Sequence, residues 1–286
     1  MYYLGVDGGG SGCRARLTDA EGRPCGQAVG GPANIASDPA QAQANLIALA
    51  RAALSERYHP DHVCAVFGVA GANIPSAAAA AAQALSAALP FAQLSVVSDV
   101  STALSGALEG RDGILAALGT GSVFARHLGG AMRQVGGWGY QLGDEGSGAW
   151  MGRLALIKAL RAVDGHAPLT GLLADLLARL GGGAGIVEFA RHATPAEIAA
   201  LVPSICAAEV AGDGAARAIL GAATAEISAA IDLLQPEGEA LPVVFTGGLG
   251  PLFAERLQGR WLILPESGNG LDGAVAQARA LAPARP

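Results

Sequence analysis

Residues 2–19 read YYLGVDGGGSGCRARLTD, an apolar run, a turn of glycine and serine, and a run in which arginine alternates with smaller residues. Two such runs on either side of a glycine turn predict antiparallel strands at 2–7 and 13–19. A second turn, AEGR, leads to a third expected strand at 24–30. The start of the chain therefore predicts a β-meander.

Helices and strands are expected to alternate after this meander. Asp38 followed by Pro39 combines an N-cap residue with a favoured first helical residue, so a helix is expected to begin there. Apolar segments that end in small residues predict strands at 62–71 and 92–99, and alanine-rich segments predict helices within 76–89 and at 100–110.

The opening pattern restarts at Gly113, where strands are expected at 113–119, 123–129 and 131–137. The rest is expected to be mainly helical, with helices at 148–163, 169–180, 195–210, 214–234 and 270–282 and strands in 241–248 and 260–265. A meander that occurs twice predicts an α/β fold of two related domains, 1–110 and 111–270, facing each other across a central cleft. No motif indicates the role of residues 169–234.

Composition narrows the class of protein. Hydrophobic residues make up 51% of the 286 positions and charged residues 15%, which is typical of a folded chain. A net charge of -6 argues against nucleic acid or an anionic membrane as partner. No unbroken apolar run reaches the length of a membrane span and the start lacks a signal-peptide pattern, so a cytoplasmic protein is expected. The four cysteines form no CxxC pair and are expected to be core residues.

The two glycine turns, DGGGSG at 7–12 and GTGS at 119–122, are candidate phosphate sites. Glycine lets the backbone approach a ligand, and successive N–H groups form an anion-binding concavity. An ordinary hairpin turn is the alternative for each. A Walker A loop is excluded because the only lysine, Lys158, lies in an expected helix, and a dinucleotide fingerprint is excluded because a strand follows the first turn.

Two further positions stand where strands end. Asp99 follows the apolar run LSVVS, and either caps the next helix or acts as a general base on an attacking hydroxyl. The cluster FTGGLG at 245–250 is either a tight turn between a strand and a helix or a flat backbone platform for adenine.

The stretch GGWGYQLGDEGSGAWMG at 136–152 combines glycines with aromatic residues and an acidic pair. Such a loop is permissive in its backbone, aromatic in its walls and anionic at one point. The Asp144 carboxylate can accept hydroxyl hydrogen bonds, and the Trp138 ring can pack on an apolar face. Trp150 is expected in the core, and Glu145 either supports the site or favours the helix start.

In order along the chain, the motifs YLGVDGGGSGCRARLTD, GVAGA, VVSDVSTAL, LAALGTGS, GGWGYQLGDEGSGAWMG, VVFTGG and GLDGAVAQA resemble the N-acetylglucosamine kinase and glucosamine kinase branch of the BadF/BadG/BcrA/BcrD ATPase family. This family belongs to the acetate kinase/sugar kinase/Hsp70/actin superfamily. The resemblance implies two ribonuclease-H-like (actin-like ATPase) domains, with ATP and sugar in the cleft, a C-terminal helix at about 271–286 that packs on the first domain, and a homodimer.

The resemblance also implies a role for each candidate residue. Asp7 would lie near Mg²⁺, and Asp99 would bind the sugar and act as base on its 6-hydroxyl. The other implied contacts are with the phosphates (Gly8, Gly9, Gly10, Ser11, Thr120, Gly121, Ser122), the amino sugar (Asn34, Gly137, Trp138, Asp144) and adenine (Gly247, Gly248).

Several alternatives stay open at this point. GPANI at 31–35 resembles the glucosamine kinases, and GGWGYQLGDEGS resembles the N-acetylglucosamine kinases. The substrate can therefore be N-acetylglucosamine or glucosamine, and an enzyme strictly for glucosamine is the alternative. An activator ATPase of the dehydratase or reductase type would hold an iron–sulfur cluster on cysteines, and the cysteines of this chain are scattered.

Overall fold

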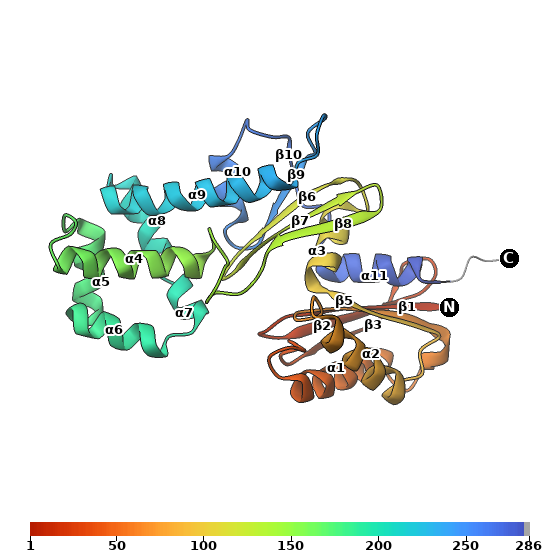
Figure 1. Cartoon of the computed structure of the whole chain (residues 1–286). Helices are drawn as coiled ribbons and strands as arrows, with labels where there is room; N and C mark the ends of the chain where they lie inside the picture. Colours follow the sequence, from red (N-terminus) through yellow and green to blue (C-terminus); the bar gives the residue numbers. More distant parts are fainter. Residues whose placement is uncertain (283–286) are drawn as a thin grey trace. The chain divides into compact units, whose positions relative to one another are not determined.

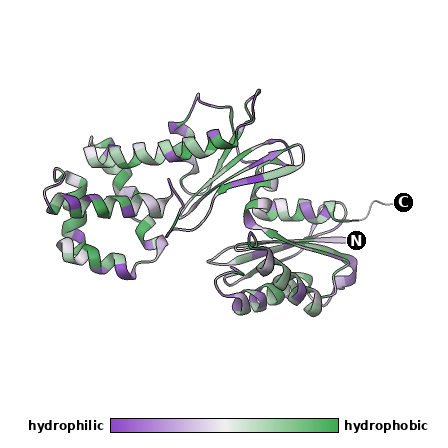
Figure 2. Ribbon diagram, viewed as in Figure 1, coloured by the Kyte–Doolittle hydropathy of each residue, from purple (hydrophilic) through white to green (hydrophobic). Residues whose placement is uncertain are grey.

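The computed structural model describes residues 1–282, which form two compact units (Figure 1). Unit 1 comprises residues 1–113 and 127–132 and the described residues from Glu266 onward. Unit 2 comprises residues 114–126 and 133–265. Figure 2 shows hydrophobic residues throughout the sheets and helices of both units, and each unit has a hydrophobic core of its own.

The sheet of unit 1 contains the predicted meander. Its strand order is β3-β2-β1-β4-β5, where the strands are β1 (Tyr2–Gly8), β2 (Cys13–Thr18), β3 (Pro24–Gly30), β4 (Val63–Val69) and β5 (Gln93–Ser98). Strand β1 pairs antiparallel with β2 and parallel with β4. The carboxyl ends of β1, β4 and β5 therefore meet at one edge, where ligands of α/β folds collect.

Helices cover both faces of this sheet (Figure 1). Helices α1 (Pro39–Leu54) and α2 (Pro75–Ala88) lie on one face, α3 (Asp99–Leu108) and α11 (Gly270–Ala280) lie on the other, and a short 3₁₀ turn, η1 (Pro60–His62), precedes β4. Side chains alternate between the two faces of β1, so Leu4 and Val6 lie in the core between the sheet and helices α1 and α2. Asp7 consequently points to the face that carries α3 and α11.

Helix α11 is the expected C-terminal helix. Asn269 and Asp272 form a capping box at its start. A Cβ on Gly5 would come within 2.5 Å of the Val275 nitrogen, so glycine at this strand position lets α11 lie directly on β1. The expected range reached residue 286, and its positions 283–286 lie outside the described residues.

The sheet containing β6 repeats the order of the first sheet. Its strands are β6 (Gly113–Leu118), β7 (Ser122–Leu128), β8 (Ala131–Gly136), β9 (Val243–Thr246) and β10 (Ile263–Leu264), in the order β10-β9-β6-β7-β8. Read from β8, this is the meander followed by two further strands, with β9 parallel to both β6 and β10. The repeated topology confirms the predicted α/β class with two ribonuclease-H-like units.

The tip of the β7–β8 hairpin, residues 127–132, belongs to unit 1. The Asp112 carboxylate accepts the backbone N–H of Gly129 at 3.0 Å and lies 3.0 Å from His127 Nδ1. The expected boundary at residue 110 had assigned this hairpin to the second domain as a whole.

Unit 2 is mainly helical. Its helices are α4 (Gly148–Val163), α5 (Gly171–Leu180), α6 (Gly182–His192), α7 (Pro195–Ala199), α8 (Val202–Val210), α9 (Gly214–Leu234) and α10 (Gly250–Arg256). Residues of α4, α5, α6, α8 and α9 share one hydrophobic core, so the segment 169–234 builds the helical layer of this unit.

Two expectations for the helices were wrong. The single helix expected at 195–210 is divided into α7 and α8, because Pro203 lacks an N–H and its ring would clash with the carbonyl one turn earlier. Helix α6 was not expected, because glycines at 182, 183 and 185 disfavour a helix, yet Ile186 anchors it in the core.

Within residues 1–282, no single helix has the length and hydropathy to cross a membrane; only Pro195–Val210 and Gly214–Leu234 taken together, bent by 115°, would meet those criteria. All four cysteines are free thiols, with Cys13 and Cys64 buried and Cys25 and Cys206 half-buried.

Candidate active site

The glycine turn of unit 1 follows β1. Its inner carbonyls bond to neighbouring loops: Gly8 O accepts the N–H of Ala70 at 2.8 Å, and Gly9 O accepts the N–H of Ala33 at 2.9 Å. Gly10 and Ser11 form the exposed end of the turn, and a Cβ on Gly10 would meet nothing within 4 Å. An anion can therefore approach the backbone and hydroxyl at this end.

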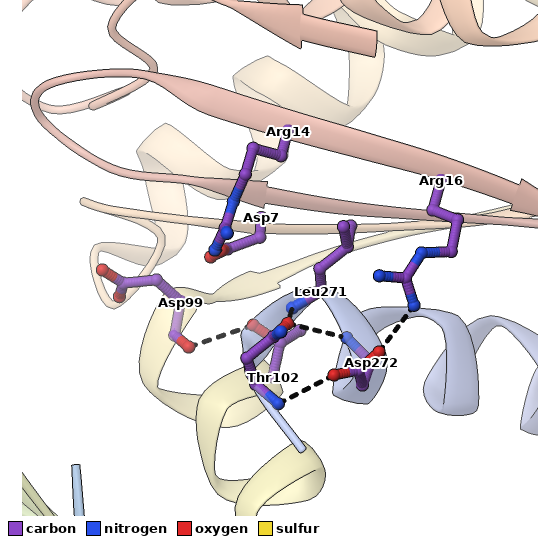
Figure 3. Close-up of polar contacts among 8 residues, drawn as sticks. Asp7, Arg14, Arg16, Asp99, Thr102, Leu271 and Asp272 are labelled. Carbon is purple, nitrogen blue, oxygen red and sulfur yellow. Dashed lines mark hydrogen bonds and ion pairs between the residues drawn. The ribbon is translucent and has the colours of Figure 1, made fainter. Parts of the chain in front are cut away.

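Asp7 is the residue before this turn, and its carboxylate is paired with Arg14 (Figure 3). The two residues are opposite each other in the β1–β2 register, and Arg14 Nη2 lies 2.7 Å from Asp7 Oδ2. Arg14 was not among the site residues expected from sequence. The signal was present in the hairpin, because a turn that pairs Gly8 with Cys13 also pairs Asp7 with Arg14.

Asp99 is the first residue of α3 and does not cap it. The Ser98 hydroxyl accepts the N–H of Ser101 at 3.2 Å and is the N-cap, so the alternative role of Asp99 as the cap was wrong. Asp99 Oδ1 accepts the N–H of Val100 at 3.0 Å. The second oxygen, Oδ2, takes no part in that bond and is available to a substrate hydroxyl.

The electrostatic surroundings of Asp99 favour a base. Burial raises the pKa of the Asp99 carboxyl, the hydrogen bond from Val100 lowers it, and the negative charge of Asp7 raises it further. A carboxylate whose pKa is raised is a stronger proton acceptor, which is the property that general bases require.

The donor set around Asp7 fits a magnesium ion held mainly by phosphate. Mg²⁺ usually takes one or two carboxylates together with waters and phosphate oxygens. Arg14 bonds to Asp7 Oδ2, and a Cβ on Gly270 would lie 3.0 Å from Oδ1, so the glycine keeps the approach to Oδ1 open. Within residues 1–282 no cluster of three or more His, Cys, Asp or Glu could hold a metal ion.

Asn34 lies beside the same turn. Its Oδ1 accepts the N–H groups of Ala36 at 3.0 Å and Ser37 at 3.1 Å, which fixes the side chain and leaves Nδ2 outside these bonds. The N–H of the adjoining Ala33 donates to Gly9 O, which ties the Asn34 segment to the glycine turn. Unit 1 thus brings together Asp7, the Gly8–Ser11 turn, Asn34 and Asp99.

The turn of unit 2 places its two hydroxyls differently. Thr120 is exposed at the tip, whereas Ser122 is buried and donates its hydroxyl to the Glu145 carbonyl at 2.8 Å. The carbonyls of Gly119 and Thr120 accept the first N–H groups of α4, from Gly148 at 2.9 Å and Ala149 at 3.1 Å. Ser122 therefore holds the loop, and Thr120 is the hydroxyl that faces solvent.

The loop 136–147 lies against this turn. Gly136 and Gly137 both adopt φ of 72°, a region that favours glycine, and a Cβ on Gly137 would lie 2.8 Å from Val123 Cγ2. Asp144 is buried, with φ of 59°, and its Oδ1 accepts the N–H of Gly139 at 3.1 Å. Burial raises the pKa of Asp144, the Gly139 hydrogen bond lowers it, and the charge of Glu145 raises it.

Trp138 is 76% exposed and borders a cavity of about 320 Å³. The cavity is lined by apolar residues, including Phe124 and Val135, and by Glu145 and Glu226. Trp150 packs against the core of unit 2, as expected. Of the two tryptophans of this stretch, Trp138 is therefore the one that borders the cavity.

The third glycine cluster packs on the end of β6. Gly247 adopts φ of 81°, and a Cβ there would lie 2.3 Å from the Leu118 carbonyl oxygen, so only glycine fits this turn. A Cβ on Gly248 would meet nothing within 4 Å, which leaves a bare surface next to the GTGS turn. Unit 2 thus brings together Thr120, Gly121, Gly137, Asp144, Gly247 and Gly248.

Comparison with known proteins points to a nucleotide-using enzyme. The model of the BadF/BadG/BcrA/BcrD ATPase family matches residues 4–254. Glucosamine kinase GspK of Vibrio cholerae is 31% identical over 286 residues, covering 96% of this chain and 94% of that protein. An N-acetylmuramic acid/N-acetylglucosamine kinase of Clostridium acetobutylicum is 28% identical over 260 residues, covering 87% and 85%.

Solved structures with a similar fold include sugar kinases. A candidate N-acetylglucosamine kinase of Chromobacterium violaceum has a TM-score of 0.81 at 32% identity and covers 97% of this chain and 98% of its own. A ROK family glucokinase of Streptomyces griseus, with a TM-score of 0.53 at 18% identity over 98% and 99% of the two chains, shares the fold.

The fold and these relatives define an ATP-using enzyme with two ribonuclease-H-like units. The chain belongs to the BadF/BadG/BcrA/BcrD ATPase family. The family and the use of ATP, both predicted from sequence, are confirmed.

Proposed function

We propose that this protein is an amino-sugar kinase that transfers the γ-phosphoryl group of ATP to the 6-hydroxyl of N-acetylglucosamine or glucosamine. The observation that carries the proposal is Asp99, a half-buried carboxylate with a raised pKa at the carboxyl end of β5, in the same unit as a phosphate-type glycine turn. Relatives named as kinases of these sugars match most of the chain.

Asp99 is the proposed base. The N–H of Val100 holds Oδ1, so Oδ2 accepts the proton of the 6-hydroxyl as the oxygen attacks phosphorus. Within residues 1–282 no cation bonds to Asp99, whereas Arg14 bonds to Asp7, and burial raises the pKa of the Asp99 carboxyl, so Asp99 is the one suited to proton transfer.

Each unit has its own proposed phosphate-binding groups. Unit 1 contributes the Gly8–Gly10 backbone, the Ser11 hydroxyl and the Arg14 guanidinium, and unit 2 contributes Thr120 and Gly121. Asp7 would hold Mg²⁺ through Oδ1, and the ion, when bound, neutralises charge on the phosphoryl oxygens. Ser122 supports this turn from inside through Glu145.

The remaining residues position sugar and adenine. Asn34 Nδ2 and the Asp144 carboxylate bond to sugar hydroxyls, and Trp138 covers the apolar face of the ring. Gly137 lets the sugar approach the backbone. Gly247 and Gly248 offer adenine a surface without side chains. We further propose a homodimer in the cytoplasm, where ATP is available.

The experiment that tests this function measures ADP release with Mg²⁺ and ATP in the presence of N-acetylglucosamine, glucosamine, glucose, N-acetylmannosamine or no sugar. Each sugar that supports turnover is then supplied as its 6-deoxy analogue. The proposal predicts release that needs an amino sugar and stops with the 6-deoxy form. Release that is independent of sugar would overturn it and indicate an activator ATPase instead.

A further inference from the structure

Thr102 is a fully buried polar residue three positions after Asp99, on the side of α3 that faces the sheet. Its hydroxyl donates to the backbone carbonyl of Asp99 at 3.0 Å (Figure 3). This bond ties the side chain of Thr102 to the peptide that carries the proposed base.

The same side chain rests on the sheet next to Asp7. Gly68 of β4 is the register partner of Asp7 on β1. A Cβ on Gly68 would come within 2.3 Å of Thr102 Oγ1 and 2.5 Å of Thr102 Cγ2, so glycine leaves the space that threonine fills. Thr102 is therefore a spacer between the strand beside Asp7 and the turn that bears Asp99.

Helix α11 confines α3 from another side. A Cβ on Gly273 would come within 1.9 Å of the Thr102 carbonyl oxygen, so the two helices touch backbone to backbone. Gln277 Nε2 of α11 also donates hydrogen bonds to Ser101 O at 3.1 Å and to Ser101 Oγ at 3.2 Å. With β4 and α11 in direct contact with Thr102, the first turn of α3 has little freedom to shift.

We propose that Thr102 is a positioning residue that fixes Asp99 relative to Asp7. The inference rests on the proposed function, in which Asp99 is the base. Its physical basis is that catalytic groups must be held to within a fraction of an ångström, since a 1 Å displacement can cost on the order of 100-fold in rate. Thr102 makes no contact with substrate in this role and acts only through Asp99.

The test compares three substitutions of Thr102. Thr102→Val keeps the volume and removes the hydroxyl, and we expect kcat to fall about 10- to 100-fold while the ATP Kd and sugar KM stay within about twofold. Thr102→Ser keeps the hydroxyl and is expected to retain kcat within about threefold. Thr102→Ala places no new atom against Gly68. If Thr102→Val does not fold, the same fall of kcat is expected of Thr102→Ala.

Thr224→Val is the matched control. The Thr224 hydroxyl donates to the Leu220 carbonyl at 2.8 Å within α9, so this variant loses the same kind of helical side-chain bond in unit 2. It should leave kcat unchanged. An equal fall of kcat in the Thr102 and Thr224 variants, or an unchanged kcat in Thr102→Val, would overturn the proposal.

A double-mutant cycle separates this inference from the proposed function. If Thr102 acts through Asp99, the residual rate of Asp99→Asn should be the same with threonine or valine at 102. If Thr102→Val lowers the rate of Asp99→Asn by the same factor as it lowers the rate of the unaltered enzyme, Thr102 has a general structural role and does not act through Asp99. Near-full activity of Asp99→Asn alone would instead remove the base assignment, whatever the Thr102 variants do.

Discussion

The carboxylate of Asp144 lies directly against the backbone of Gly121: a Cβ at position 121 would come within 2.6 Å of Asp144 Oδ2. This contact joins the loop proposed for the sugar to the turn proposed for phosphate. The Asp144 carboxylate is also held by the N–H of Gly139, and a side chain at position 121 would disturb this arrangement.

Gly121→Ala is therefore expected to displace Asp144 and raise the sugar KM by about 10-fold or more, because a binding group has moved. Gly119→Ala is the matched control in the same turn, since a Cβ there would meet nothing within 4 Å. Steady-state kinetics with varied sugar measure both. Equal KM values for the two variants would show that the contact has no role.

Asp144→Asn should weaken sugar binding while stabilising the fold. The loss of a charge-assisted hydrogen bond is expected to raise the sugar KM about 10- to 100-fold. Asparagine is the suitable replacement because, like aspartate, it tolerates the positive φ found here.

The stability effect follows from the raised pKa of Asp144. A carboxyl whose pKa is higher in the folded state favours folding below its unfolded pKa, and that contribution is lost as the pH rises through the folded pKa. Asp144→Asn should therefore raise Tm at neutral pH, and the difference should vanish in acid. Asp175→Asn, at an exposed ion pair with Arg179, should change neither Tm nor KM. A lower Tm for Asp144→Asn at neutral pH would contradict the account.

Arg14→Ala should weaken ATP binding about 10-fold, since one charge-assisted phosphate contact is lost. Arg14→Lys should recover part of the affinity, because lysine keeps the charge without the planar fork. Calorimetric titration with ATP measures the Kd directly. Arg23→Ala removes another exposed arginine of the same unit, one that pairs with Asp19, and should bind ATP normally. Unchanged affinity in Arg14→Ala would exclude the guanidinium from the phosphate site.

The pH dependence of kcat should report Asp99. Burial and the charge of Asp7 raise the pKa of this carboxyl, and only its ionised form accepts a proton. The rate should therefore increase with pH through a transition that lies above the usual range of an aspartate, and then level off. A kcat that stays constant as the pH falls to the range in which an ordinary aspartate titrates would be inconsistent with Asp99 as the base.

Local signals made the sheets predictable. The glycine turn between β1 and β2 and the alternation on both sides are short-range features, and the same holds for the restart at Gly113. Helix α6 depends on long-range packing of Ile186, which overrides its glycine-rich start. The break between α7 and α8, in contrast, has a local cause in Pro203.

The candidate site was predictable where a residue stands at a strand end, as Asp7 and Asp99 do. Contacts between distant segments were not. The hydroxyl of Ser122 was assigned to phosphate, yet it donates to Glu145, 23 residues later. Ser98 and Asp99 are both good caps by residue type, so only the geometry of α3 separates cap from candidate base.

The most direct test of the central claim is the comparison of Asp99→Asn with the unaltered enzyme in two assays, kcat with saturating amino sugar and the Kd for ATP. If Asp99 is the base, the variant loses most of kcat, by about 100-fold or more, while the Kd for ATP changes little. Near-normal turnover by Asp99→Asn would show that another group accepts the proton and would contradict the account.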